Sequence, residues 1–337
     1  MSRRPRSLTA MGSEAPVAGT GESRRRGRPR PRHLLSLADL SAEEIRLLVQ
    51  RGLGYATGKI CSDGQLKDCI LGTFFAKTST RTRTAFTSGA LRLGARVIAY
   101  GPDDLQLNTG ETLHDTGRVL SGMLDVLVAR TASDPAELAA LAAQDKMAVI
   151  NAMTADEHPT QALADLTTIL QQLGRVEGVT LLYLGEGNNT AAALALALPR
   201  FPGNALYFRT PPGYGLKRLF VERGAAWANA ASGVLDERHD LTRLPEHVDV
   251  VYTTRWQTTG TQKQDTHWRG VFDPFRVDSA LMDRYPNAIF MHDLPAHRGE
   301  EVTASVLDGE ASIVFEQAEN KLHSAMAVLE WCAGRDY

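Results

Sequence analysis

The sequence predicts an α/β protein with two parallel-sheet domains, and three observations support that prediction. The chain has 337 residues, which is enough for two domains of ordinary size. An apolar strand at residues 70–75 is followed by a helical pattern and a second strand at residues 95–99, the order of a parallel βαβ unit. A strand, a glycine-rich turn and a helix then restart at residue 179, after a crossing at residues 174–178.

The composition is ordinary for a globular chain in water. Hydrophobic residues make up 43%, and the formal net charge of -2 gives no general attraction to nucleic acid or acidic membranes. No apolar run is long enough to cross a bilayer. Cys61, Cys69 and Cys332 lack metal-type spacing, which favours reduced thiols in a cytoplasmic protein. We therefore expect neither a membrane nor a nucleic-acid partner.

Residues 1–32 differ from the rest of the chain because they are rich in arginine, proline and glycine. Such a segment cannot bury a core, so we predict a disordered tail. Three roles are open for it: a solvated tail without function, a binder of polyanions, or an organelle transit segment. We favour the first, because proline and glycine disfavour an amphipathic presequence helix.

The folded part begins with a helix capped by Ser41, whose capping-box partner Glu44 stands three residues later. After residues 95–99, a helix is expected at residues 112–123 and strands at 125–130 and 147–150. Pro159 then suits the first turn of a helix with an apolar face, because its missing N–H is not needed there.

The densest chemistry lies between the strand at 70–75 and its helix, in Lys-Thr-Ser-Thr-Arg-Thr-Arg at residues 77–83. If a helix starts near Thr80, its unpaired N–H groups converge on one point with the hydroxyls of Ser79, Thr80 and Thr82 and the guanidinium of Arg81. These donors predict a site for a small dianion, most simply a phosphate. The alternative is ordinary capping beside a solvated arginine; three hydroxyls interleaved with two arginines favour the anion site.

The second half of the chain repeats the alternation of strands and loops. A dinucleotide site is the weaker interpretation of the turn at residues 185–190, because Thr190 stands where a third glycine belongs. Strands are expected at 248–253 and 288–291. Leu294-Pro295 is a candidate for a cis bond in a tight turn.

Residues 77–83 resemble the carbamoyl-phosphate motif of the aspartate/ornithine carbamoyltransferase family. Three further segments agree in the family's order: residues 115–120 leading to Arg130, His-Pro-Thr-Gln at 158–161 and His-Asp-Leu-Pro at 292–295. The resemblance implies two doubly wound parallel-sheet domains, one for carbamoyl phosphate at 33–173 and one for the acceptor at 174–316. It also implies a C-terminal helix, residues 317–337, that packs back on the first domain.

The resemblance implies a carbamoyl-phosphate site made of Ser79, Thr80, Arg81, Thr82, Arg130, His158, Gln161, Leu294 and Lys321. Arg81, Arg130 and His158 are the expected catalytic residues, together with Asp293. Lys321 replaces the arginine of ornithine-type members and keeps the charge without the two-pronged grip. The implied reaction is acyl transfer that needs no metal and no cofactor.

The expected acceptor-binding residues are Asn189, Thr254, Arg255, Gln257, Thr258 and Asp293. Ornithine-type members have an aspartate at the position of Thr254 and a cysteine at that of Asp293. Thr-Arg-x-Gln at 254–257 looks instead like aspartate-type members, whose arginine and glutamine hold a substrate carboxylate. A carboxylate at Asp293 can attract a cationic acceptor or accept its proton, although an outward-facing side chain is the alternative.

We therefore predict transfer of a carbamoyl group from carbamoyl phosphate to a small amine. The mixed motifs favour a diamino acid or a lysine derivative in a specialised biosynthesis, and ornithine or a non-catalytic carbamoyl-phosphate-binding regulator are the alternatives. The family implies a homotrimer in which the loop at 101–112 reaches a neighbour's site. Thr109 stands there where aspartate-type members have a lysine.

Overall fold

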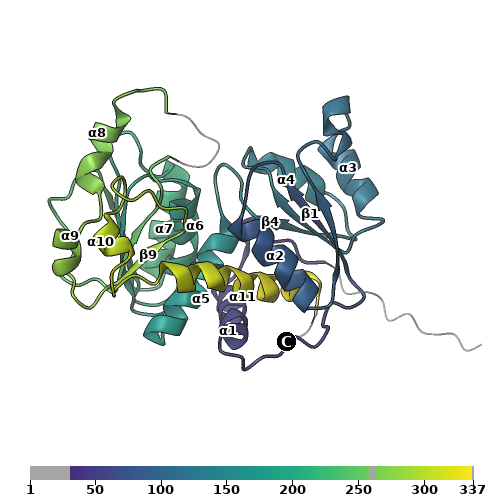
Figure 1. The fold of residues 1–337 in the computed structure, drawn as a ribbon, viewed down its shortest axis with the longest axis horizontal. Helices are drawn as coiled ribbons and strands as arrows, with labels where there is room; N and C mark the ends of the chain where they lie inside the picture. The colour runs from purple at the N-terminus through teal and green to yellow at the C-terminus, as the bar shows by residue number, and fades with distance from the viewer. Residues whose placement is uncertain (1–30, 258–262, 336–337) are drawn as a thin grey trace, which may run out of the picture.

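The computed structural model describes residues 31–257 and 263–335, so the predicted tail lies almost entirely outside the described residues. Two parallel sheets lie side by side, each in its own domain, which confirms the predicted α/β class (Figure 1). The first sheet has the order β2-β1-β3-β4, with strands β1 (Ile70–Phe75), β2 (Arg96–Tyr100), β3 (Val126–Arg130) and β4 (Ala148–Asn151). The second has the order β7-β6-β5-β8-β9, with strands β5 (Thr180–Leu184), β6 (Ala205–Arg209), β7 (Val234–Arg238), β8 (Val250–Thr253) and β9 (Ile289–His292).

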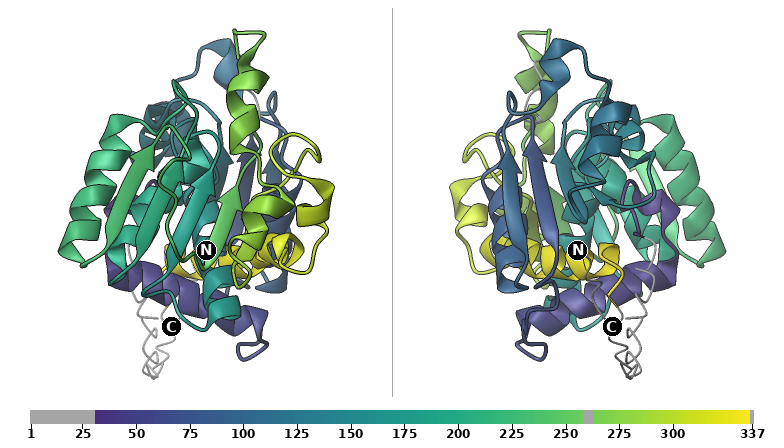
Figure 2. Two further views of the ribbon diagram at one scale, coloured as in Figure 1. Left: turned by 90° about the vertical axis from the view of Figure 1, so that its left-hand side faces the viewer. Right: turned by 90° about the vertical axis from the view of Figure 1, so that its right-hand side faces the viewer.

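Helices connect the strands and cover the sheets (Figure 2). In the first domain they are α1 (Ala42–Ala56), α2 (Arg81–Arg92), α3 (Leu113–Leu120), α4 (Pro135–Ala142) and α5 (Pro159–Leu173), with short 3-10 turns at Leu37–Asp39 and Gln106–Thr109. In the second they are α6 (Asn189–Ala197), α7 (Arg218–Ala230), α8 (Trp268–Phe272), α9 (Ser279–Asp283) and α10 (Ala304–Leu307), with 3-10 turns at Leu198–Arg200 and Asp273–Phe275.

The order of the strands reverses between β1 and β3 in one sheet and between β5 and β8 in the other. In open parallel sheets a ligand binds beyond the carboxyl ends of the strands at such a reversal. Both sheets therefore offer a binding edge, and the loops that follow β1, β5 and β8 carry the predicted motifs.

Local sequence explains where the helices begin. Both reciprocal hydrogen bonds of the Ser41–Glu44 capping box are present at α1, as predicted. Thr112 caps α3 by accepting a hydrogen bond from the N–H of Asp115. Thr80 precedes α2 without a side-chain capping bond, so the first N–H groups of this helix have no capping partner.

The C-terminal helix α11 (Val314–Cys332) joins the two domains. It starts beside the second sheet and runs back to pack against α1, α2 and α5, which confirms the predicted return to the first domain (Figures 1 and 2). One buried apolar cluster continues through the contact, with members such as Ile45 of α1, Leu166 of α5, Leu194 of α6 and Val328 of α11. The two domains therefore share part of their core, which holds their binding edges in one relative position.

Two simpler expectations also have an outcome. The three cysteines form no disulfide. Within the described part of the chain, no helix is both long and apolar enough to cross a bilayer.

Candidate active site

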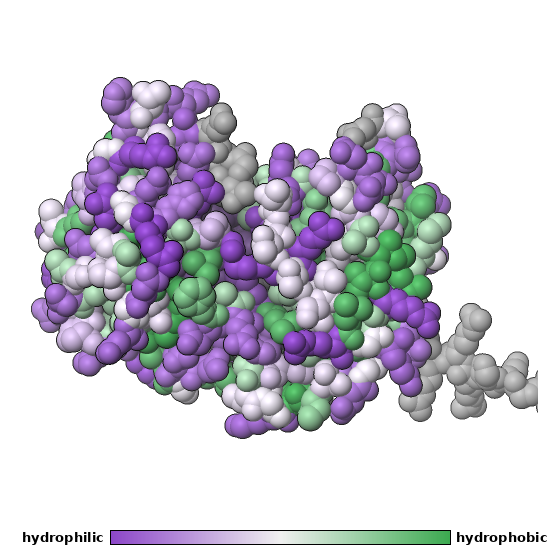
Figure 3. All heavy atoms as spheres, in the orientation of Figure 1, coloured by the Kyte–Doolittle hydropathy of each residue, from purple (hydrophilic) through white to green (hydrophobic). Residues whose placement is uncertain are grey.

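A cavity of about 250 Å³ lies where the binding edges of the two sheets meet. The space-filling view shows the hollow between the two lobes, where hydrophilic side chains gather (Figure 3). The first domain and α11 line it with Ser79, Thr80, Arg81, Thr82, Arg130, His158, Gln161 and Lys321. The second domain lines it with Asn189, Thr254, Arg255, Asp293 and Leu294. Residues far apart in the chain are thus brought together in one place.

The start of α2 forms one wall of the cavity. Thr80 stands at its N-cap, Arg81 is its first residue, and Thr82 is buried. Unpaired N–H groups and the positive end of the helix dipole favour an anion at this position. The wall therefore has the donors that a phosphate group requires.

Three cations surround this wall. Burial lowers the pKa of Arg81, and it lowers the pKa of Arg130 to about 10. Burial also lowers the pKa of Lys321, whose ammonium donates a hydrogen bond to Gln161 Oε1. The buried Nε of Arg130 has no hydrogen-bond partner among the described residues. Arg130 is buried and the other two cations are partly buried. Cations withdrawn from water without a full set of partners are costly, and a bound dianion would offset that cost.

His158 lies directly before α5 and faces the same cavity. Burial, and then the charges of Lys321 and Arg130, hold the pKa of His158 well below its usual value. The ring is therefore neutral near pH 7 and carries a single N–H donor. Its Nδ1 lies 3.3 Å from Thr160 Oγ1; if that hydroxyl donates, Nε2 carries the proton.

The loop after β5 forms the opposite wall. Asn188 caps α6 through the N–H groups of Thr190 and Ala191, and its own amide donates to Thr254 Oγ1 over 3.0 Å. The amide of Asn189 donates instead to the carbonyl of Thr154 in the first domain, over 2.9 Å. An added side chain at Gly187 would come within 2.2 Å of the backbone nitrogen of Leu216, so this turn requires glycine.

Arg255 follows Thr254 after β8 and lines the cavity. Its Nε is buried and has no hydrogen-bond partner within the described residues. A guanidinium in this state suits a carboxylate ligand, because it presents a planar set of N–H donors.

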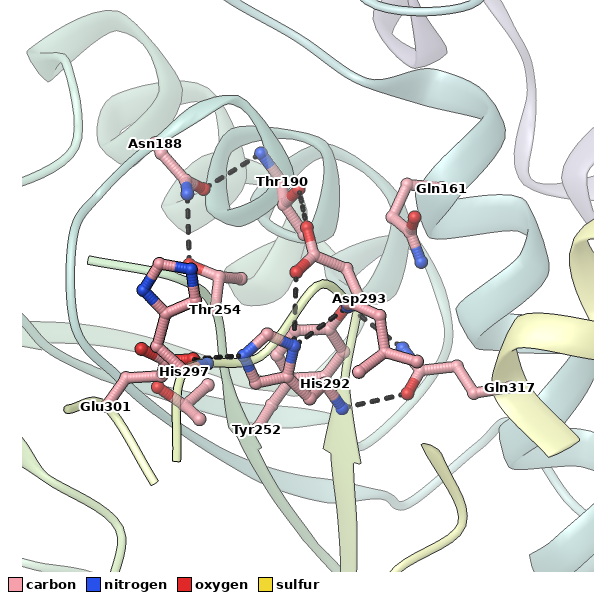
Figure 4. A network of polar contacts seen from close by, with 12 residues as sticks. Gln161, Asn188, Thr190, Tyr252, Thr254, His292, Asp293, His297, Glu301 and Gln317 are labelled. Atoms are coloured by element: carbon pink, nitrogen blue, oxygen red, sulfur yellow. Dashed lines mark hydrogen bonds and ion pairs between the residues drawn. The ribbon is translucent and has the colours of Figure 1, made fainter. Parts of the chain in front are cut away.

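Asp293 lines the cavity, so the outward-facing alternative is wrong, and Figure 4 shows its carboxylate beside Thr190. Its Oδ2 accepts a hydrogen bond of 2.9 Å from the hydroxyl of Thr190. Its charge raises the pKa values of Arg81, Arg130 and Lys321 against the effect of burial. The carboxylate therefore lies within electrostatic reach of all three cations. The Leu294-Pro295 bond beside it is cis, as predicted.

Two predicted acceptor residues are not placed in the site. Gln257 is described but does not line the cavity, and Thr258 lies outside the described residues. Besides Thr190, four residues that were not among the expected site residues line it: Thr78, Met153, Asn188 and Pro295. Thr190 was considered only as a mismatch to a glycine motif, although its hydroxyl contacts Asp293. A threonine in the first turn of a helix that follows a glycine-rich loop is the signal that was available.

No ligand set for a metal is found in residues 31–257 and 263–335, where no cluster of three or more His, Cys, Asp or Glu side chains is arranged to hold an ion. The cavity is instead rich in cations, amides and hydroxyls. This donor set suits anions and zwitterions.

A two-domain α/β protein with an anion-binding wall on one side of a cavity and polar acceptor groups on the other has the form of a group-transfer enzyme. Comparison with known proteins specifies the class. Residues 32–171 match the aspartate/ornithine carbamoyltransferase carbamoyl-P binding domain, and residues 177–332 match the Asp/Orn binding domain of the same family. The chain belongs to the aspartate/ornithine carbamoyltransferase family.

Individual relatives share most of the chain. An ornithine carbamoyltransferase of Oceanobacillus iheyensis is 38% identical over 303 residues, which cover 88% of this chain and 93% of the relative. An ornithine carbamoyltransferase of Nostoc punctiforme is 39% identical over 309 residues, covering 90% and 98%. The solved ornithine carbamoyltransferase of Pyrococcus furiosus superposes with a TM-score of 0.84 at 36% identity, covering 91% of this chain and 98% of that one.

Proposed function

We propose that this protein transfers the carbamoyl group of carbamoyl phosphate to the side-chain amine of ornithine and releases phosphate. The observation that carries the proposal is the cavity itself, in which residues of all the predicted motifs meet between a carbamoyl-phosphate-binding domain and an amino-acid-binding domain. Ornithine as the acceptor is supported by the relatives, which are named ornithine carbamoyltransferases and which this chain matches over nearly their whole length.

The proposed reaction follows from the two walls. The phosphate lies at the start of α2 with Arg81, Ser79, Thr80 and Lys321, and the carbonyl oxygen faces donors from Arg130, His158 and Thr82. A neutral amine attacks the carbonyl carbon, so an N–C bond forms while the C–O bond to phosphate breaks. The donors stabilise the negative charge that grows on the carbonyl oxygen, and phosphate leaves with the bonding electron pair. Holding both substrates across one cavity supplies much of the acceleration.

The amide end of the carbamoyl group has its own partners in this proposal. Gln161 and the carbonyl of Leu294 would orient it, and both line the cavity. The side chain of Gln161 is fixed from two sides, because it accepts from Lys321 and donates to Asp165 over 2.8 Å. A rotation of Gln161 therefore requires the loss of two hydrogen bonds.

A second acceptor class, another diamino acid or a lysine derivative, is favoured by the residues around the acceptor wall. Thr254 places a hydroxyl, bonded to Asn188 and Tyr183, where ornithine-type members have a carboxylate. Arg255 and Asp293 add one charge of each sign to the same wall. These differences favour an acceptor whose charged groups are spaced differently from those of ornithine.

We also propose that the working enzyme is a homotrimer. Among the described side chains of the loop at 101–112, none lines the cavity of its own subunit, which fits a loop that serves a neighbour. Large apolar side chains are exposed on the first domain at Leu91, Val119 and Met123, and a subunit contact over them would remove this apolar surface from water. Light scattering coupled to gel filtration tests this proposal, and a monomer with full activity would contradict it.

We place the enzyme in the cytoplasm, where the substrates of amino-acid metabolism are available. The three cysteines support this location because none forms a disulfide, although Cys61 is exposed.

The deciding experiment supplies carbamoyl phosphate with a panel of amines: ornithine, lysine, two shorter diamino acids and aspartate. Phosphate release gives the rate, and mass spectrometry identifies the carbamoylated product. If ornithine gives the highest kcat/KM of the panel, the proposal is supported. If another diamino acid gives a higher value, the second acceptor class replaces ornithine. Binding of carbamoyl phosphate without transfer to any amine would indicate a regulator.

A further inference from the structure

Thr190 holds a carboxylate at the boundary between the two halves of the cavity. Its hydroxyl donates to Asp293 Oδ2 over 2.9 Å, and the whole residue is buried with 1% exposure. The position of Thr190 is itself fixed, because its N–H donates to the side chain of Asn188 at the start of α6. Thr190 is therefore a rigid donor for one oxygen of Asp293.

Oδ1, the other carboxylate oxygen of Asp293, faces the lone pair on Nδ1 of His292. His292 is buried, and its Nδ1 accepts a hydrogen bond of 2.8 Å from the N–H of Leu294. The proton of the neutral ring is therefore on Nε2, which lies 3.1 Å from Oε1 of the buried Glu301 (Figure 4). Asp293 Oδ1 lies 3.5 Å from Nδ1 and receives no donor from it. Oδ1 is thus the oxygen left for a donor from the cavity, and a proton on Oδ1 would face the Nδ1 lone pair.

The charge of Asp293 determines the kind of donor that suits it. The charged or titratable groups around it come from several elements and are Arg81, Arg130, Asp165, Tyr183, Tyr252 and Lys321, with Arg255 in the same cavity wall and His292 next to it in the chain. A phosphate dianion offsets two of the three positive charges of Arg81, Arg130 and Lys321. Oδ1 of Asp293 still lacks a donor, and a primary ammonium supplies both an N–H donor and a charge opposite to that of the carboxylate.

We propose that Thr190 is a specificity-determining residue, which orients Asp293 so that Oδ1 receives the reacting ammonium of the acceptor and removes one proton from it. This inference rests on the proposed function. The proton moves from nitrogen to the carboxylate, and the neutral amine forms the N–C bond while the C–O bond to phosphate breaks. The second proton of the nitrogen leaves with phosphate, and Asp293 returns its proton to water. The enzyme is thereby set for acceptors that arrive as primary alkyl ammonium ions.

The test compares Thr190→Val, which removes the hydroxyl at nearly constant shape, with Thr190→Ser, which keeps it. The kcat/KM for the best acceptor of the wild type is measured between about pH 7 and 9, where the neutral fraction of a free alkyl amine rises about tenfold per pH unit. We expect Thr190→Val to lose about tenfold or more at the lower pH and much less at the higher pH. Thr190→Ser should stay within about twofold of the wild type, and the Kd for carbamoyl phosphate should change little in either variant.

Asp293→Asn provides a second variant in case Thr190→Val does not fold, and it should show the same steeper pH dependence. A loss that is equal at every pH, or that comes with weaker carbamoyl-phosphate binding, would overturn the inference. Wild-type activity separates the two proposals. If the wild type transfers no carbamoyl group to any amine, the proposed function fails. If it does and Thr190→Val keeps the wild-type pH profile, only the role of Thr190 fails.

Discussion

Gln317 Nε2 donates a hydrogen bond of 2.7 Å to Asp165 Oδ1, which ties the C-terminal helix α11 to α5 inside the protein. The same carboxylate accepts from Gln161 Nε2 at 2.8 Å and from the hydroxyl of Tyr252 at 3.0 Å. Gln317 Oε1 in turn accepts from the N–H of His292, next to Asp293, at 2.8 Å. One buried carboxylate therefore connects Gln161 in the carbamoyl-phosphate half with β9, which ends one residue before Asp293 in the acceptor half.

Replacing Asp165 tests this connection. Asp165→Leu leaves three buried donors without their shared acceptor, and each unsatisfied group costs about 1–3 kcal/mol. We expect the free energy of unfolding to fall by about 3 kcal/mol or more, and the KM for carbamoyl phosphate to rise because Gln161 loses its support. Denaturant unfolding and steady-state kinetics measure both quantities. Asp165→Asn keeps one acceptor oxygen and should cost clearly less; equal losses in the two variants would contradict a shared acceptor.

Lys321 makes carbamoyl-phosphate binding sensitive to alkaline pH. Burial lowers the pKa of this lysine, so its ammonium loses its charge at a lower pH than a lysine in water does. Only the charged form attracts the dianion, and affinity should therefore decrease as the pH rises. Lys321→Arg keeps its charge and should remove this decrease, while Lys321→Met should weaken binding about tenfold or more at pH 7. Calorimetric titration at several pH values measures the Kd, and an unchanged pH dependence in Lys321→Arg would exclude Lys321 as its source.

Most of the fold follows from local signals in the sequence. The Ser41–Glu44 capping box and the strand at 70–75 appear where they were expected, because hydrogen bonds and buried apolar side chains within a few residues determine both. The strand expected at 248–253 is shorter than predicted, since the structure has β8 at Val250–Thr253. Periodicity locates an element better than its ends, which depend on the neighbouring strands.

The sequence predicts the part of the site that one continuous motif forms by itself. The residues of the loop before α2 line the cavity because the turn from strand to helix alone directs their donors. Thr190 and Asp165 were missed as functional residues, because their roles depend on partners 103 and 87 residues away in the chain, Asp293 and Tyr252. The partner in a distant hydrogen bond of this kind leaves no pattern in a single sequence, so only the folded chain shows that Thr190 meets Asp293 and that Asp165 meets Tyr252.

Glu157 makes the stability of the protein depend on pH. Its carboxylate is buried and accepts from the hydroxyl of Ser36 and the N–H of Leu37, yet burial raises its pKa to about 7. A raised pKa means that the folded state holds a proton that the unfolded state has released between about pH 4.5 and 7. Stability from this group is therefore present at acid pH and is lost as the pH rises through 7, by up to about 3 kcal/mol.

Glu157→Gln isolates this contribution. An amide can accept from Leu37 and donate to Ser36, so the local hydrogen bonds persist without the titration. The difference in unfolding free energy between the variant and the wild type should grow in the variant's favour from about pH 5 to 8. Asp39, Arg200 and Arg223 face the same carboxylate and are unchanged in both proteins. A difference that is constant over this range would show that Glu157 does not titrate there.

Arg255 should contribute to the binding of the acceptor and not to the binding of carbamoyl phosphate. Its buried Nε, which has no partner in the part of the chain that the structure describes, and its place on the second domain suit the carboxylate of an amino acid. We expect Arg255→Met to raise the KM for the acceptor about tenfold or more and to leave the Kd for carbamoyl phosphate nearly unchanged. Arg255→Lys keeps the charge and should recover part of the loss. Equal effects on both substrates would indicate instead that Arg255 supports the domain structure.

His158 should contribute to the rate as a neutral donor and not as an acid that titrates near pH 6. Its pKa is held well below the usual value by burial and by Lys321 and Arg130, so the ring keeps one proton and no charge throughout the working range. His158→Ala removes a donor to the carbonyl oxygen and should lower kcat by about 10²–10³-fold with little change in carbamoyl-phosphate affinity. His158→Gln can still present an N–H and should lose less. Because the neutral form is the active one, the shape of the kcat profile between about pH 6 and 7 should be the same in the wild type and both variants. A decrease toward acid pH that is seen in the wild type and disappears in His158→Ala would show that the imidazole gains its charge in this range, which would contradict a pKa held well below the usual value.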